Sequence, residues 1–292
     1  MTTVSTRPAT ARILLTRPTP AYWRVTIDNP PINVMVSEMI LQFQEVIKAL
    51  ETDEHVKVVV FDSAVDDYFL NHLDFRADFE GLNSLPEGPT GLAPWLDFLV
   101  RLTRVPVVSI ALIRGRATGT GSELALACDM SFASREKAVL SQWEVGVGAI
   151  PGGGPMARLP HLIGRNRALE VLLTGDDVRG DRAEAYGYVN RAVRDADLDA
   201  FVESLTTRIA AFDRWTLAGI KRLVNASLPS DVELGAGWDA CITSFGRTTT
   251  QDSIKDLMAH GFNEAGAFEH RLGHHLGHFA RIRTDGLNPG DI

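Results

Sequence analysis

Two almost uninterrupted apolar runs, Val56–Phe61 and Pro106–Ile113, constrain the fold of this chain most strongly. Both are rich in β-branched residues and lack polar alternation, so they predict strands that are buried on both faces. Ahead of the first run, Ser37 precedes an apolar stripe at helical spacing, formed by Ile40, Phe43, Val46, Ile47 and Leu50. We expect Ser37 to cap this helix. Strands that alternate with helices in this way indicate an α/β fold.

The remaining pattern divides the chain into four parts. Shorter strands are expected at Ile13–Leu15, Tyr22–Ile27, Met130–Ala133 and Val139–Leu140, and helices at Pro94–Thr103 and Ser122–Cys128. After Asn190, apolar residues at helical spacing predict helices at 201–212, 215–225, 231–249 and 251–262. We therefore expect a loose arm over residues 1–12, an α/β core over 13–200, a helical region over 201–262, and a His-rich C-terminal helix and tail over 263–292.

Composition narrows the possible classes of protein. The chain has 29 basic and 37 acidic residues, a formal charge of 29 − 37 = −8, which argues against nucleic-acid and anionic-membrane partners. The longest apolar run, Val105–Ile113, is much shorter than the ~20 residues of a membrane span. Cys128 and Cys241 belong to no CxxC pair, so no disulfide framework or zinc knuckle is expected. The N-terminus has no visible secretory signal, and we expect a cytoplasmic protein.

Two glycine-rich turns carry the candidate chemistry. The first, Gly115–Glu123, follows a buried strand and opens a helix, but it matches neither a dinucleotide fingerprint nor a phosphate loop. Backbone N–H groups that converge near a helix N-terminus can instead stabilise an oxyanion. The second turn, Gly146–Pro155, closely follows Glu144. Glu123 and Glu144 are therefore candidate acid/base residues; the alternative is a helix-start carboxylate and a surface loop residue.

Five ordered motifs resemble the crotonase (enoyl-CoA hydratase/isomerase) superfamily over roughly residues 20–262. They are Asp28-Asn29-Pro30-Pro31-Ile32-Asn33; Tyr68-Phe69-Leu70-Asn71-His72-Leu73-Asp74; the segment Gly115 to Asp129; Gln142-Trp143-Glu144 with Gly148 to Gly154; and Leu173 to Asp176 with Ala183 to Asn190.

The resemblance implies a β-β-α spiral catalytic core over residues 13–200 and C-terminal helices that build a homotrimer or a dimer of trimers. It further implies an acyl-CoA substrate, with CoA as part of the substrate, no separate cofactor and no metal. By position, Leu73 and Thr120 supply the backbone N–H groups of the oxyanion hole, and Glu123 and Glu144 are the catalytic acid/base pair. The residues expected to bind the substrate are Asn71, His72, Asp74, Arg76, Gly119, Trp143 and Gly152.

Several positions depart from the family pattern. Thr120 replaces a glycine, and its side chain is expected to crowd the site. His72 also replaces a glycine, where it would be strained if φ is positive. Trp143 stands where the family has proline, and Arg76 only approximates the family's basic residue. The altered loops keep open a carbon–carbon bond hydrolase of the 6-oxocamphor hydrolase type, although that branch lacks the glutamate retained here as Glu123. A catalytically silent scaffold is the third possibility.

Histidines raise two further questions. His72 either reaches the pocket as an acid/base group or is a loop residue that faces solvent or caps a turn. Near the C-terminus, an apolar stripe and a histidine stripe share one predicted helix: Phe268, Leu272, Leu276 and Phe279, with His270, His274 and His278. A metal site is conceivable there. We expect instead that the apolar stripe packs on a neighbouring subunit or covers the pocket, with the histidines on the wet face.

Overall fold

A computed structural model describes residues 12–76 and 85–285, with side chains to residue 281. Its larger sheet has the strand order β1-β2-β3-β5-β7-β10, in which β1 and β2 pair antiparallel and the others parallel. The strands are β1 Ile13–Thr19, β2 Tyr22–Ile27, β3 Val58–Ser63, β5 Val108–Ile113, β7 Met130–Ser134 and β10 Arg191–Val193. The two apolar runs are the central strands β3 and β5, which confirms their predicted burial on both faces.

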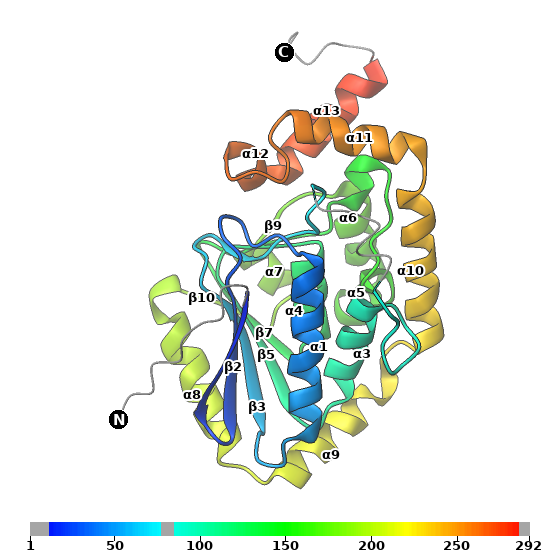
Figure 1. The fold of residues 1–292 in the computed structure, drawn as a ribbon. Coiled ribbons are helices and arrows are strands. Elements are labelled where there is room, and N and C mark those ends of the chain that lie inside the picture. Colours follow the sequence, from blue (N-terminus) through cyan, green and yellow to red (C-terminus); the bar gives the residue numbers. More distant parts are fainter. Residues whose placement is uncertain (1–11, 77–84, 286–292) are drawn as a thin grey trace.

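A second sheet is built from short strands, in the order β4-β6-β8-β9. These strands are β4 Tyr68–Leu70, β6 Arg116–Thr118, β8 Val139–Ser141 and β9 Val178–Arg179. Along the chain, β4, β6 and β8 each follow a strand of the larger sheet, and helices α3 Pro94–Arg104, α4 Thr120–Ala127 and α5 Pro155–Ile163 come next (Figure 1). This repetition is the expected β-β-α spiral.

The main core lies between the larger sheet and helices α1 Ser37–Thr52 and α3 (Figure 1). The whole predicted stripe of α1 is buried, and Phe43 contacts Trp95 and Phe98 of α3 with ring centroids 5.6 and 4.9 Å apart. The predicted Ser37 cap is wrong. Ser37 is the first helical residue, and extended Val36 occupies the capping position because it follows Met35, which bridges to Leu73.

The remaining helices lie partly within residues 13–200 and partly after them. They are α6 Arg165–Thr174, α7 Gly180–Tyr186, α8 Leu198–Ala210, α9 Arg214–Val224, α10 Asp231–Phe245 and α11 Thr248–Ala259, with short 3-10 helices η1 Glu144–Val147, η2 Asp195–Asp197 and η3 Asn225–Ser227. The single helix predicted over 231–249 is wrong: it ends at Phe245, and α11 begins after Gly246 and Arg247. Gly246 keeps a right-handed backbone with φ of −71°, and the low helix propensity of glycine favours a break there.

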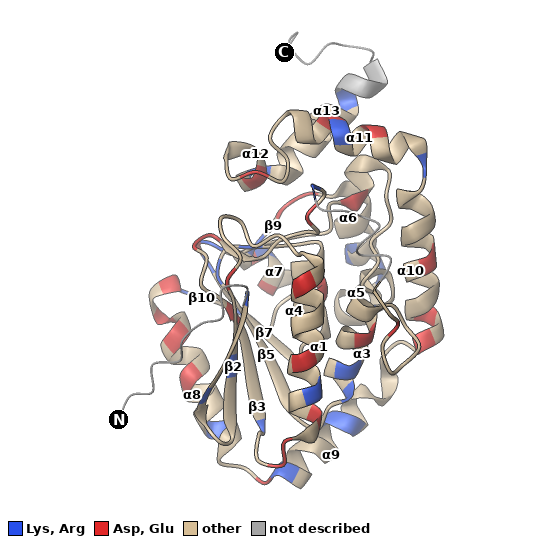
Figure 2. Cartoon of the chain, viewed as in Figure 1, with Lys and Arg blue, Asp and Glu red and all other residues tan. Residues whose placement is uncertain are grey.

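The predicted N-terminal arm lies outside the described residues apart from residue 12, and the four-part division stays a prediction. None of the described helices is long and apolar enough to span a membrane. Figure 2 shows Lys and Arg scattered over many elements with Asp and Glu among them, so this view of the described residues shows no basic stripe.

The C-terminal segment folds back over η1 as two helices, α12 Ala267–His270 and α13 Leu272–Asp285 (Figure 1). The predicted apolar stripe is buried against Trp143 and Val147 of the same chain: Phe268, Leu272, Leu276 and Phe279. His270 and His274 are exposed, as expected, whereas His278 is half-buried. The described residues hold no group of three or more His, Cys, Asp or Glu that could bind a metal ion.

Candidate active site

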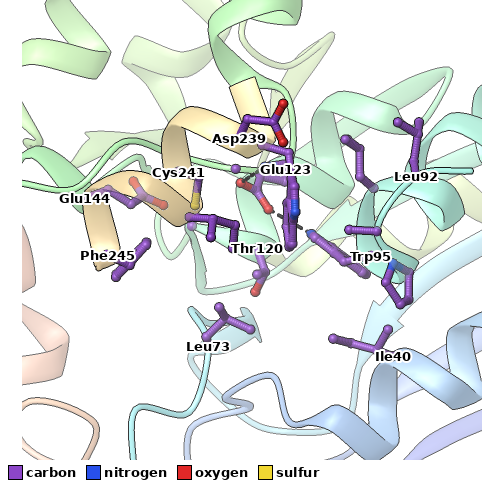
Figure 3. Close-up of a pocket in the computed structure, with 18 of the residues that line it drawn as sticks. Ile40, Leu73, Leu92, Trp95, Thr120, Glu123, Glu144, Asp239, Cys241 and Phe245 are labelled. Atoms are coloured by element: carbon purple, nitrogen blue, oxygen red, sulfur yellow. Dashed lines mark hydrogen bonds between the residues drawn. The ribbon is translucent and has the colours of Figure 1, made fainter. Parts of the chain in front are cut away.

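A cavity of about 740 Å³ lies between α3, α4, η1 and α10 (Figure 3). Eight of the predicted site residues line it: His72, Leu73, Gly119, Thr120, Glu123, Trp143, Glu144 and Gly152. Asn71, Asp74 and Arg76 do not. The structure therefore brings both glutamates and both expected oxyanion-hole residues to one cavity.

The backbone N–H groups of Leu73 and Thr120 have no acceptor among the described residues. Leu73 forms a parallel bridge with Met35, whose bonds use His72 O and Asp74 N and so leave the Leu73 N–H unused. Thr120 is the first residue of α4, where backbone donors have no partner within the helix. Two unpaired donors beside one cavity can bind the oxygen of a polarised carbonyl.

The Thr120 side chain ties the two oxyanion loops together. Its Oγ1 donates to the carbonyl oxygen of Asn71 at 2.5 Å. The hydroxyl is thus engaged by the neighbouring loop, while Thr120 lines the cavity, and the expectation that its side chain crowds the site stays a prediction. The bond spans from α4 to the loop that carries Leu73, so it fixes the spacing of the two N–H donors.

Glycines are required where α4 meets this loop. A Cβ on Gly121 would lie 1.8 Å from the carbonyl oxygen of Leu70, which brings the helix start into direct contact with β4. Gly119 has φ of +55°, and a Cβ there would approach Glu144 Oε1 to 3.2 Å. The glycine pattern therefore reflects a close approach of backbone to backbone at the site.

Glu123 is buried at 3% exposure in the first turn of α4. Its Oε2 accepts from Trp95 Nε1 at 2.8 Å, and its Oε1 accepts from the Gly153 N–H at 2.6 Å. Burial raises the pKa of Glu123, and the bonds from Trp95 and Gly153 oppose that rise. Because both oxygens accept from donors, the ionised carboxylate fits this position.

Glu144 begins η1 and is also buried, at 6% exposure. No described residue bonds its Oε2. Burial, and then the negative charge of Glu123, raise the pKa of Glu144 well above its usual range. The two glutamates thus sit in different environments, and such a contrast separates a general acid from a general base.

His72 fits neither of the simple expectations in full. It is buried at 1% exposure, so a solvent-facing loop histidine is wrong. Its backbone φ is not positive, so the expected strain is absent at this residue. The ring stacks on Phe262 with centroids 4.3 Å apart. Its Nε2 lies 3.0 Å from Glu269 Oε1, and its Nδ1 lies 2.7 Å from the Leu73 carbonyl oxygen. Both ring nitrogens therefore lie within hydrogen-bond distance of a carbonyl or carboxylate oxygen, which fixes the orientation of the ring.

Glu269 of α12 is the partner that sequence reasoning missed. It is fully buried and accepts from His72, from Asn71 Nδ2 at 3.1 Å and from the Asn263 N–H at 2.5 Å. Although burial raises its pKa, the charge of His72 and these donors lower it overall. The only signal in the sequence is an acidic residue beside the apolar stripe, which does not reveal partners almost 200 positions away.

Asp74 and Arg76 lie on the outer side of the loop that carries Leu73. Asp74 accepts from Asn263 Nδ2 at 2.7 Å and from Arg76 Nε at 3.4 Å. The Arg76 side chain is 47% exposed. These residues therefore stand beside the cavity, linking its loop to the C-terminal segment.

Comparisons with known proteins identify the family. Residues 21–271 match the family model for enoyl-CoA hydratase/isomerase. A Dictyostelium discoideum protein named as a probable mitochondrial enoyl-CoA hydratase is 31% identical, over 72% of this chain and 74% of its own. The short-chain-enoyl-CoA hydratase of Clostridium acetobutylicum is 27% identical, over 80% and 88%.

A crystal structure from Streptomyces avermitilis, assigned to the enoyl-CoA hydratases, superposes with a TM-score of 0.87. It is 39% identical and covers 94% of this chain and 99% of its own. The matched region contains both glutamates and the two glycine-rich turns. The chain is therefore an enzyme of the enoyl-CoA hydratase/isomerase family, within the crotonase superfamily.

Proposed function

We propose that the enzyme adds water across, or shifts, the α,β double bond of an acyl-CoA thioester. The observation that carries this proposal is the arrangement of Glu123, Glu144 and two unpaired backbone N–H groups around one cavity. A thioester carbonyl placed between the N–H groups of Leu73 and Thr120 is polarised, and the enolate that follows is stabilised there. Each such donor contributes about 2.7–4 kcal/mol in comparable sites.

In the hydration direction, the Glu123 carboxylate takes a proton from a water molecule while the oxygen of that water forms a bond to the β-carbon. The electron pair of the double bond moves through the α-carbon onto the thioester oxygen. Glu144, which its environment favours in the protonated form, then gives its proton to the α-carbon. The product is a 3-hydroxyacyl thioester, and proton exchange restores both glutamates. A double-bond shift uses the same enolate with proton transfer between two carbons.

The substrate form, oligomeric state and location that we propose for this activity are those that the resemblance to the family implies. CoA enters as part of the substrate, with no separate cofactor, and the enzyme works as a homotrimer or a dimer of trimers in the cytoplasm, without nucleic-acid or membrane partners. Large apolar side chains that are exposed on one chain support assembly: Trp215 at 83%, Leu223 at 68%, Val224 at 67% and Val232 at 81%.

One observation favours a second candidate, a carbon–carbon bond hydrolase acting on cyclic β-diketones. His72, paired with Glu269, forms part of the cavity wall. That reaction also needs a stabilised enolate, together with a group that activates water. The retained Glu123 favours the hydratase, and two buried carboxylates facing one cavity argue against a silent scaffold.

A ligand screen by thermal shift separates these candidates. Ligands that bind only the native protein raise its Tm. We expect a shift with unsaturated and saturated acyl-CoAs; a shift with cyclic diketones alone would support the hydrolase. With an active acyl-CoA identified, Glu123→Gln and Glu144→Gln should each lower kcat by about 100-fold or more with little change in binding. Unchanged kcat in both variants would refute the proposed roles.

A further inference from the structure

The wall beside Glu144 is aromatic. Trp143 and Phe75 meet edge to face with ring centroids 5.5 Å apart, and Phe245 of α10 stacks on Phe75 at 5.8 Å. All three residues line the cavity, and Phe245 is drawn beside Glu144 in Figure 3. The reacting carbons of a bound substrate would therefore have flat aromatic surface on this side.

The wall beside Glu123 is aromatic as well. Trp95 lines the cavity while its Nε1 donates to Glu123. Trp238 of α10 reaches the glycine turn, because a Cβ on Gly152 would lie 3.1 Å from its ring. The glutamates thus lie between two aromatic walls contributed by elements far apart in the sequence.

The charge of the cavity has one sign. Among the described residues, its acidic lining residues are Glu123 and Glu144, which are buried, and Glu87 and Asp239, which are exposed. No Lys or Arg lines it among the described residues, and the sequence of residues 77–84 contains none. A carboxylate on the acyl group would meet the buried Glu123 carboxylate and the two exposed acidic side chains, with no cation from the described residues to pair with, at a cost of affinity.

We propose that the acyl group accepted by this cavity is an uncharged, aryl-bearing enoyl group of the cinnamoyl type, rather than a short alkyl or a carboxyl-bearing one. The proposal rests on the proposed function, because it concerns the same site. A conjugated aryl enoyl group is flat and rigid, so it can lie against both aromatic walls and gain offset or edge contacts with them. Binding energy from this remote ring also helps to position the double bond between the glutamates.

The test compares kcat/KM for crotonyl-CoA, cinnamoyl-CoA and glutaconyl-CoA, which differ in their acyl ends. We expect cinnamoyl-CoA to exceed crotonyl-CoA by about tenfold or more, and glutaconyl-CoA to fall about 100-fold below cinnamoyl-CoA. In Trp238→Leu, the ratio of cinnamoyl to crotonyl activity should drop several-fold. Phe212→Leu, which changes an aromatic side chain that is 46% exposed between α8 and α9 and does not line the cavity, should keep the wild-type ratio.

Binding of saturated analogues separates this proposal from the proposed function. Thermal shifts are measured with dihydrocinnamoyl-CoA, butyryl-CoA and glutaryl-CoA at equal concentrations. A preference for dihydrocinnamoyl-CoA without turnover of any enoyl-CoA would refute the hydratase and support the cavity inference. Turnover with crotonyl-CoA equal to or better than cinnamoyl-CoA would overturn the cavity inference and leave the hydratase standing. Equal shifts from all three analogues would also overturn it.

Discussion

Replacing Glu269 by alanine tests whether this buried carboxylate holds the oxyanion loop against the C-terminal segment. The change removes the acceptor of three donors, on His72, Asn71 and Asn263. Breaking a buried charged pair by removing one partner costs about 3–5 kcal/mol. The cost of each unpaired donor, about 1–3 kcal/mol, is contained in that figure rather than added to it. Against a total stability of about 5–15 kcal/mol, this is a large fraction.

The loss of stability is measured by urea unfolding, with tryptophan fluorescence as the signal. Glu269→Ala should lower the free energy of unfolding by about 3–5 kcal/mol at pH 7. Glu269→Gln, which keeps the shape but turns an amide donor toward other donors, should lose about 2 kcal/mol. Glu264→Ala is the matched control, because Glu264 is exposed on the same segment. Equal unfolding free energies for Glu269→Ala and the control would refute the reasoning.

The pH dependence follows from the lowered pKa of Glu269 in the folded state. Its stabilisation is fully present above the unfolded value of about 4.3 and is lost as pH falls through the folded pKa below it. The difference between wild type and Glu269→Gln should therefore shrink as pH drops below about 4. A difference that grows on acidification would contradict the assigned charge.

Two further changes test the site. Trp95→Phe removes a hydrogen-bond donor to Glu123, so the pKa of Glu123 should rise. The acid limb of the pH profile of kcat/KM should then move to higher pH. An acid limb that does not move would contradict the assignment of Glu123 as the base. Gly121→Ala should destabilise the protein by about 1–3 kcal/mol in urea unfolding, because its Cβ meets the Leu70 carbonyl. Gly277→Ala, in α13 with open space around it, should be neutral or stabilising.

The parts of the fold that could be predicted depend on neighbours in sequence. The strands β3 and β5 and the buried stripe of α1 follow from apolar patterns over a few residues. The errors lie at element ends. Val36, not Ser37, occupies the capping position, where a distant bridge to Leu73 sets the backbone. A local pattern carries no information about such a bridge.

The sequence by itself determined the strand, glycine turn and helix that present Glu123, and the second turn that follows Glu144. It determined them because glycine positions and apolar spacing are local requirements of the backbone. Only the tertiary structure decided how the two carboxylates differ, since the donors to Glu123 come from Trp95 and Gly153 and Glu144 receives none on its Oε2. It also decided that Glu269 meets His72 across 197 positions. The pKa of a carboxylate depends on burial and donors, and these arise only when distant segments pack together.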